Sequence, residues 1–465
     1  MRTLTVLFAV LFLSSSWWSS MAMAAISMKV QTLVEHHDPD GWKNFRGKIP
    51  ENSSDSYELI LDRRHIVINY PKSRKIYDLE RRQIYDISDS RRVIDATSLY
   101  SVAGFKVLEL QNREIMRNFF AEMKKDAKSS DEINKVAAYE LFDAEQELAV
   151  SRPDSPTRIT SGKIGDKVVY TAEGRELAVL SSKGFTVSPS EAELFARVLR
   201  YAWVGHPQIL DQIAKGQRIP QSMKFKFRSG WEKTMTMTIS DLHTVDEVAL
   251  VPTSYTNAYD DPRGTVSDDL LKNMDVLVHA HKLDNKTVAN IVTGTKKDFD
   301  QAVRAKQNFP ALLANLELGL MGMERPPIHD SFRQALLEDG HVRQYVQALR
   351  PGQGKEDMQK AADLLVELRL YAGEKEYMLK VFEADIRSQI GELEKPKELL
   401  REVLSANPAL AGVYKDYGDL FIRSYQTDMA WRFWDAGRRL APDFKNFDAV
   451  NQLERMLVEK HPEYF

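Results

Sequence analysis

The chain has 465 residues, more than one hydrophobic core usually supports, so two or more domains are expected. Hydrophobic residues make up 43% of it and charged residues 28%, which excludes wholesale disorder and a polytopic membrane protein. Lys and Arg total 64 against 67 Asp and Glu, so bulk charge gives no reason to expect nucleic acid as a partner. The chain contains no cysteine, which excludes disulfides, thiol nucleophiles and thiolate metal sites.

Residues 1–24 have the features of a secretory signal peptide. Arg2 supplies a positive charge, residues 4–13 are apolar, and Ala22-Met23-Ala24 has the form of a signal-peptidase site. The apolar run is shorter than the roughly 20 residues that a membrane span needs. We therefore expect cleavage after Ala24 and a periplasmic or secreted protein, with no membrane span in the mature chain. The alternative is an uncleaved N-terminal anchor.

Residues 25–255 are predicted to form an α+β domain built on antiparallel sheet. Short segments rich in β-branched and aromatic residues form a first group of strands, at 57–61, 65–69, 75–79 and 83–87. The turns between them are too short for crossover helices, which favours antiparallel pairing. Apolar residues then recur at helical spacing over 99–125, and a second helix is expected over 131–150.

A second group of strands follows, at 167–171, 175–180, 185–187, 223–227 and 234–239. A helix is expected to begin near Ser188-Pro189, because proline and the following Glu191 are favourable at a helix N-terminus. The order of elements, strands then helices then strands, is similar to that of periplasmic lipoprotein-carrier half-barrels. That resemblance implies an open sheet that can shelter acyl chains.

The polar, turn-rich stretch 254–264 is the best candidate for a domain boundary. Only helices are predicted beyond it. We assign 256–310 to a helical linker region and 311–465 to an all-α domain of helical hairpins, because short connectors separate the expected helices at 312–323, 330–349, 356–371 and 377–390.

A repeat period is visible near the C-terminus. Asn407-Pro408 and Ala441-Pro442 are 34 residues apart, the length of a tetratricopeptide repeat. Residues 411–444 resemble that repeat at its structural positions, which are occupied by Tyr414, Tyr417, Gly418, Phe421, Ala430, Trp434 and Pro442. The preceding window, 377–410, departs from the pattern at Lys380 and Pro396.

The residue types at these positions suit a close helix crossing. Gly418 and Ala430 are small where two helices approach, and Trp434 is large enough to fill the space around the crossing. Pro442 ends the second helix, because proline cannot continue it. One hairpin cannot bury its own apolar face, so the helices before it are expected to stack on it.

The resemblance also implies a binding groove lined by the first helix of each repeat. In this chain the groove positions are Lys415, Asp416, Asp419, Ile422 and Arg423. Asp416 and Asp419 depart from the family's clamp for a peptide carboxylate, which uses basic and amide side chains. A basic or mixed-charge partner is therefore expected. The alternative is a solvated helix face on which residues such as Asp419 and Arg423 form (i, i+4) pairs.

Other candidate sites are weak. His279 and His281 lie in a predicted helix, where residues two apart diverge and cannot share a metal ion. The stretch 36–40 (HHDPD) is interpreted as an exposed turn before the first strand, and the acidic residues at 260–261 and 268–269 lack the pattern of a calcium loop. Catalytic sequence motifs are absent, so no catalytic residue, metal or cofactor is assigned.

We therefore expect an exported, non-enzymatic binding protein whose helical repeats hold a protein or peptide. Two alternatives stay open. The sheet domain could handle a lipid or lipoprotein of the cell envelope, or the chain could be a hydrolase whose site the sequence does not reveal. An apolar cavity on the sheet would favour lipid, and a polar cleft with converging carboxylates or histidines would favour an enzyme.

Overall fold

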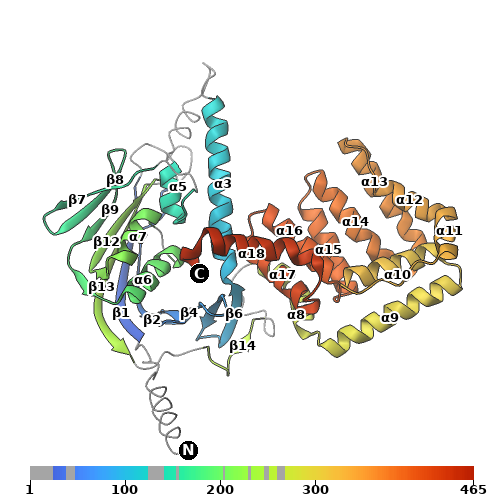
Figure 1. Ribbon diagram of the computed structural model, residues 1–465, viewed down its shortest axis with the longest axis horizontal. Coiled ribbons are helices and arrows are strands. Elements are labelled where there is room, and N and C mark those ends of the chain that lie inside the picture. The colour runs from blue at the N-terminus through green and yellow to red at the C-terminus, as the bar shows by residue number, and fades with distance from the viewer. Residues whose placement is uncertain are drawn as a thin grey trace, which may run out of the picture.

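The computed structural model describes residues 25–37, 48–123, 141–152, 157–202, 205–228, 232–245, 251–258 and 268–465. It consists of a large N-terminal sheet with packed helices and a C-terminal region of helices only, which confirms the predicted α+β fold class (Figure 1). The predicted signal peptide lies outside the described residues. None of the described helices is both long enough and apolar enough to cross a membrane.

The sheet has twelve strands in the order β14-β6-β5-β4-β3-β2-β1-β13-β12-β9-β8-β7. All neighbours pair antiparallel except β14 and β6, which are parallel. The bounds are β1 Ala25–His37, β2 Ser53–Leu61, β3 His65–Asn69, β4 Ser73–Asp78, β5 Gln83–Ser88, β6 Val93–Ser98, β7 Thr160–Ile164, β8 Lys167–Ala172, β9 Arg175–Ser181, β12 Ser222–Phe227, β13 Glu232–Val245 and β14 Thr256–Asn257. Strands β10 (Gly184–Thr186) and β11 (Arg218–Pro220) form a separate pair.

Strand β1 joins what the sequence indicated as two separate groups of strands. It pairs with β2 along one edge and with β13 along the other, so both groups belong to one sheet. Buried and exposed side chains alternate from Met28 to Leu33, and Met28 and Val30 are fully buried. The expectation that His36 and His37 precede the first strand in a turn is wrong, because both residues lie at the end of β1.

The sheet buries residues on both faces. The larger core lies between one face and the helices α3 (Leu99–Met123), α5 (Leu141–Leu148), α6 (Pro189–Ala202) and α7 (Pro207–Lys215). There the ring of Tyr77 in β4 stacks on that of Tyr201 in α6, with centroids 4.9 Å apart. A smaller cluster on the other face includes Ile60, Val67 and Ile76, and the segment with Val251 and Tyr255 packs against it.

The helical region begins with α8 (Asp268–Lys282), which carries His279 and His281 in its last turn, and continues in antiparallel hairpins. Its other helices are α9 Asn285–Arg304, α10 Asn308–Leu320, α11 Asp330–Glu338, α12 Gly340–Ala348, α13 Lys355–Leu368, α14 Glu376–Gln389, α15 Glu394–Ala406, α16 Ala411–Arg423, α17 Thr427–Leu440 and α18 Asp448–Lys460. The single helix predicted over 330–349 is two helices. Asp339 is extended and its carboxylate accepts from the backbone N–H groups of His341 and Val342, which starts α12.

The last helices return to the sheet region, as Figure 1 shows for α18. Arg432 of α17 makes a bidentate ion pair with Asp95 of β6, at 2.7 and 2.8 Å, and both side chains are buried. The ring of Trp431 lies against α3 at Gly104, where a Cβ atom would stand only 2.6 Å from it. The hydroxyl of Tyr464, next to the C-terminus, donates to the carbonyls of Leu148 and Ala149.

Candidate functional site

The helices α16 and α17 cross at Gly418. A Cβ atom on this glycine would lie 2.3 Å from Nε1 of Trp434, so a larger residue cannot be placed there without displacing the indole. The indole N–H donates to the carbonyl of Lys415 and to the carboxylate of Asp419, both at 3.2 Å. The other predicted structural positions inside this hairpin are buried, at Tyr414, Tyr417, Phe421 and Ala430.

A pocket of about 300 Å³ lies between α14 and α16. Its walls combine apolar and acidic side chains, and it is lined by Leu320, Val381, Phe382, Ala384, Asp385, Ser388, Leu400, Asp416, Asp419, Leu420 and Arg423. Three of the five predicted groove residues, Asp416, Asp419 and Arg423, therefore share one pocket. Lys415 lies beside it and pairs with Asp419 at 2.5 Å, whereas Ile422 is partly buried against the core.

The sequence analysis did not identify the contribution of α14 to this pocket. Asp385 and Ser388 lie 34 residues before Asp419 and Ile422, so they hold the same positions on the preceding inner helix. The repeat period is the signal that could have found them. It was not extended to this helix because Lys380 and Pro396 break the motif in that window.

Three carboxylates face this pocket, and Asp416 differs from the other two. Asp419 accepts from Lys415 and Trp434, and Asp385 accepts from Gln389 at 3.0 Å. Asp416 is half-buried and has no hydrogen-bond or ion-pair partner among the described residues. Burial raises the pKa of Asp416 to about 7, and although Lys415 opposes this rise, Asp419 and Asp385 add to it. A cation entering the pocket would stabilise the charged carboxylate.

Arg423 does not neutralise these acids by pairing along its helix. Its guanidinium donates to Oγ of Ser388 at 2.7 Å, which links α16 to α14. The expected alternative pair between Asp419 and Arg423 does not form. An (i, i+4) pair does exist on this face, but between Lys415 and Asp419.

Helix α10 lies across the first turns of the inner helices. The buried carboxylate of Glu317 accepts hydrogen bonds from Tyr377 at the start of α14 and from Asn407 before α16, and it pairs with Lys375 at 2.8 Å. Leu320 contacts α16 at Gly412, where a Cβ atom would stand 3.0 Å from its side chain. Since α10 covers the first turns of α14 and α16, the pocket forms beyond those turns, from Val381 to Ser388 on α14 and from Asp416 to Arg423 on α16.

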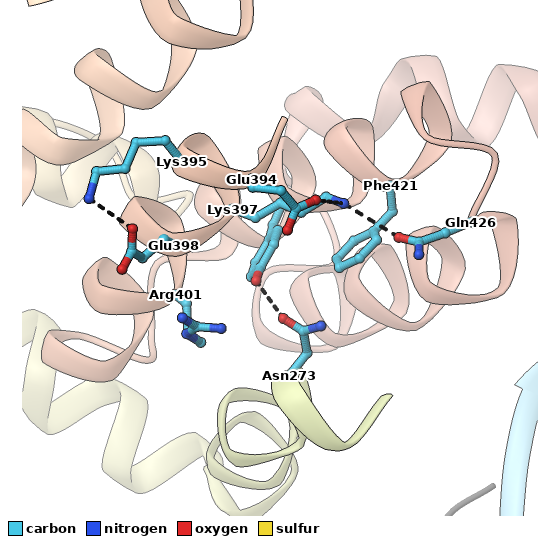
Figure 2. Close-up of a pocket in the computed structure, with 9 residues that line it drawn as sticks. Asn273, Glu394, Lys395, Lys397, Glu398, Arg401, Phe421 and Gln426 are labelled. Atoms are coloured by element: carbon cyan, nitrogen blue, oxygen red, sulfur yellow. Dashed lines mark hydrogen bonds and ion pairs between the residues drawn. The ribbon is translucent and has the colours of Figure 1, made fainter. Parts of the chain in front are cut away.

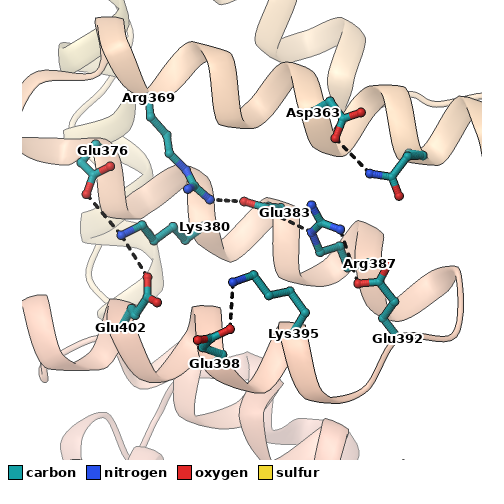
Figure 3. Close-up of polar contacts among 11 residues, drawn as sticks. Asp363, Arg369, Glu376, Lys380, Glu383, Arg387, Glu392, Lys395, Glu398 and Glu402 are labelled. Atoms are coloured by element: carbon teal, nitrogen blue, oxygen red, sulfur yellow. Dashed lines mark hydrogen bonds and ion pairs between the residues drawn. The ribbon is translucent and has the colours of Figure 1, made fainter.

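In the hairpin α14/α15, which precedes α16/α17, ion pairs take the place of the aromatic packing of the repeat pattern (Figure 3). Lys380, which stands where the repeat pattern has an aromatic residue, bridges Glu376 at 3.2 Å and Glu402 of α15 at 3.1 Å. The carboxylate of Glu383 is buried between Arg369 and Arg387. These contacts hold α13, α14 and α15 together, so we assign them a structural role.

A second pocket of about 310 Å³ lies where α8 meets α15 and α16 (Figure 2). Lys397 pairs there with Glu394 at 3.2 Å and lies over the ring of Phe421, while Lys395 pairs with Glu398 at 2.8 Å. Arg401, which also lines the pocket, adds a cation without an ion-pair partner among the described residues. The lining thus has three cations and two carboxylates, and it includes none of the predicted groove residues.

The sheet region has a pocket of about 650 Å³ at the ends of β9, β12 and β13. Its walls are charged, with Lys226 paired to Glu176 at 2.8 Å and Arg175 paired to Asp143. Acyl chains need an apolar lining, which this pocket lacks. A buried histidine and carboxylate also meet nearby, with Nε2 of His206 3.5 Å from Glu145, but both side chains are at most 1% exposed and no substrate can reach them.

Comparison with known proteins does not identify a family or a function for this chain. No protein-family model matches the chain, and no curated protein matches it in sequence. The function must therefore be inferred from the pocket between α14 and α16 and from the residues that form it.

Proposed function

We propose that the helical region is a tetratricopeptide-type repeat whose inner groove binds a peptide segment of a partner protein. In this proposal a Lys or Arg side chain of the partner enters the pocket between α14 and α16. The observation that carries it is Asp416, a half-buried carboxylate without a partner among the described residues, in a pocket that holds two further carboxylates.

The arrangement of helices supports a repeat. Hairpins α14/α15 and α16/α17 follow each other in the chain, and residues 34 positions apart on α14 and α16 line the same pocket. In such an array the first helix of each hairpin faces the groove, as α14 and α16 do here. Positive charge on the partner fits the pocket, because its three carboxylates outnumber the single guanidinium of Arg423, and Lys415 beside it is paired with Asp419.

The predicted signal peptide places this binding function outside the cytoplasm, in the periplasm or the medium. A partner would then be another exported or envelope protein. This location stays a prediction.

Lipid or lipoprotein handling is less well supported. The sheet face that a half-barrel carrier would offer to acyl chains is packed by α3, α6 and the C-terminal Tyr464. Hydrolase activity is also less well supported. The buried pair of His206 and Glu145 is the candidate for acid–base chemistry, and it has no access to solvent. We therefore retain peptide binding as the proposed function.

The test is affinity capture from periplasmic extract, with quantitative mass spectrometry of the proteins retained. The wild-type chain is compared with Asp416→Lys/Asp419→Lys, which reverses the charge of the pocket, and with Asp443→Lys, an exposed position outside it. We expect the double variant to lose partners that the control variant keeps. If all three folded proteins retain the same set, the proposed function is wrong.

A further inference from the structure

The inner face of the helical region changes in polarity from one helix to the next. Two positions recur on α12 with its C-cap residue, on α14 and on α16. They are occupied by Val346 and Leu349, then by Phe382 and Asp385, and then by Asp416 and Asp419. The offset is 36 residues from α12 to α14 and 34 residues from α14 to α16.

Burial and packing support this alignment of α12 with α14. Residues buried on α12 correspond to residues buried on α14 at the same 36-residue offset, Val342 to Met378, Tyr345 to Val381 and Ala348 to Ala384. The ring of Tyr345 also packs edge-on against that of Phe382, with centroids 5.3 Å apart. The two helices therefore turn the same face towards the groove.

The α12 end of this face is apolar and open to solvent. Val346 is 41% exposed and Leu349 is 40% exposed, and residues three apart lie on the same side of a helix. Phe382 is partly buried and lines the acidic pocket, and its ring packs against that of Tyr345, the residue next to Val346. Exposed apolar side chains beside a polar pocket are typical of a binding groove.

We propose that the groove recognises a two-residue pattern in a linear peptide. An apolar side chain packs on Val346 and Leu349, and a Lys or Arg side chain enters the pocket at Asp385, Asp416 and Asp419. This inference rests on the proposed function and names the peptide class that it selects. A segment that is basic at both positions, or apolar at both positions, does not match the two subsites of the groove.

The spacing of the pattern follows from helix packing. Packed helices lie about 8–10 Å apart, and the acidic pocket between α14 and α16 is one to two helix steps from the apolar subsite on α12. An extended peptide advances about 3.3 Å per residue, so the apolar and the basic residue should be about three to six positions apart. The sign of the charge is set by the acidic pocket, whose lining has three carboxylates and one guanidinium.

The experiment is selection of a phage-displayed library of random dodecapeptides on the immobilised full chain. Four proteins are compared: the wild type, Asp416→Asn/Asp419→Asn, Val346→Ser/Leu349→Ser, and Leu337→Ser, an exposed leucine on α11 that serves as a matched apolar control. Circular dichroism of each variant verifies that it is folded. The best wild-type peptide is then synthesised and its affinity for all four proteins is measured by fluorescence anisotropy.

We expect the wild type and the control to enrich peptides with a basic and an apolar residue about three to six positions apart. The serine variant should lose the apolar preference, keep the basic one and bind the synthesised peptide at least about tenfold more weakly, since this factor corresponds to losing most of the burial of one apolar side chain. The asparagine variant should lose the basic preference.

The outcomes distinguish this inference from the proposed function. If the wild type enriches basic residues but no apolar residue, or if the serine variant selects the same apolar pattern as the wild type, the two-residue recognition is wrong and basic-peptide binding stands. If the wild type enriches no peptides at all, or enriches peptides without basic residues, the proposed function itself is overturned.

Discussion

At the scale of single residues, Asp416 has a cost to folding that a binding role would explain. A half-buried carboxylate without a partner among the described residues is destabilising when charged, because the pocket solvates it less well than water does. Its pKa of about 7 lies well above the ordinary value of 3.8 that it regains on unfolding. Between these two pH values the folded chain binds more protons at this site than the unfolded chain does.

The stability contributed by Asp416 should therefore fall as the pH rises from about 4 to about 7, and remain low above that. Asp416→Asn removes this titration. Since one pKa unit corresponds to about 1.4 kcal/mol and partial exposure reduces the effect, we expect the variant to be more stable by about 1–3 kcal/mol near pH 8. Near pH 4 the difference should nearly vanish. Urea unfolding at both pH values measures it, and an equal difference at both would contradict the burial of this carboxylate.

Gly418 and Trp434 determine how closely α16 and α17 approach. Gly418→Leu should force the indole out of its site, since even a Cβ atom would lie 2.3 Å from it. Trp434→Ala should lower the free energy of unfolding by about 3–5 kcal/mol, because it leaves a large cavity and removes two hydrogen bonds. Thermal melting followed by circular dichroism tests both, with the exposed Tyr425→Ala as a control. Unchanged melting of both variants would show that this crossing does not hold the hairpin.

At the scale of elements, α10 limits the length of the groove. Its buried Glu317 connects it to Tyr377, Asn407 and Lys375, so the covering helix is held by charged and polar contacts as well as by apolar ones. Any ligand must then bind beyond the first turns of the inner helices. Removing α10 from this position would lengthen the groove.

Glu317→Ala should loosen α10 and cost about 3–5 kcal/mol, because it leaves the ammonium of Lys375 without one of its two acceptors. Hydrogen exchange followed by mass spectrometry should show faster exchange within residues 308–320 than in the wild type. Asp330→Ala, which removes an exposed ion pair with Arg333, is the matched control and should leave exchange there unchanged. Equal exchange of α10 in all three proteins would mean that Glu317 does not hold it.

At the scale of the whole molecule, buried contacts join the helical and sheet regions. Arg432 and Asp95 form a bidentate pair in which both side chains are buried, and Trp431 fits over Gly104. Without Asp95, the buried guanidinium of Arg432 loses its bidentate acceptor and retains the exposed Asp428 at 3.0 Å. We therefore expect Asp95→Ala to lower the free energy of unfolding by about 3–5 kcal/mol, measured by chemical denaturation. Asp241→Ala, which removes an exposed pair with Lys29, should change it by less than about 1 kcal/mol. Similar effects of both variants would rule out a buried pair at this contact.

Export is also a property of the whole molecule. If the signal peptide is cleaved as predicted, the mature protein begins at Ala25, and mass spectrometry of protein from the periplasm or the medium should show that N-terminus. Replacing Ala22 and Ala24 with bulky residues should block cleavage and leave the longer chain. Full-length wild-type protein confined to the cytoplasm would contradict export.

The sequence by itself determined features that depend on neighbouring residues. Apolar spacing and turn residues, which act within about a dozen positions, predicted the meander strands, the long helix α3 and the helical C-terminal region. The 34-residue period came from the similarity of one stretch of sequence to the next. The groove face of α16 could be named for the same reason, since it follows from one helix and its repeat pattern. Even Asp339, which divides a predicted helix in two, carries a local capping signal that a longer apolar pattern obscured.

Only the tertiary structure decided how these elements come together. Strand β1 unites the sheet by pairing with residues about 200 positions away, α10 covers part of the groove, and Asp385 and Ser388 complete the pocket from a helix whose motif is broken. The pairing of Arg432 with Asp95 likewise joins residues 337 positions apart. Periodicity shows that an apolar face or a charged side chain needs a partner, but the partner's identity depends on packing across the whole chain.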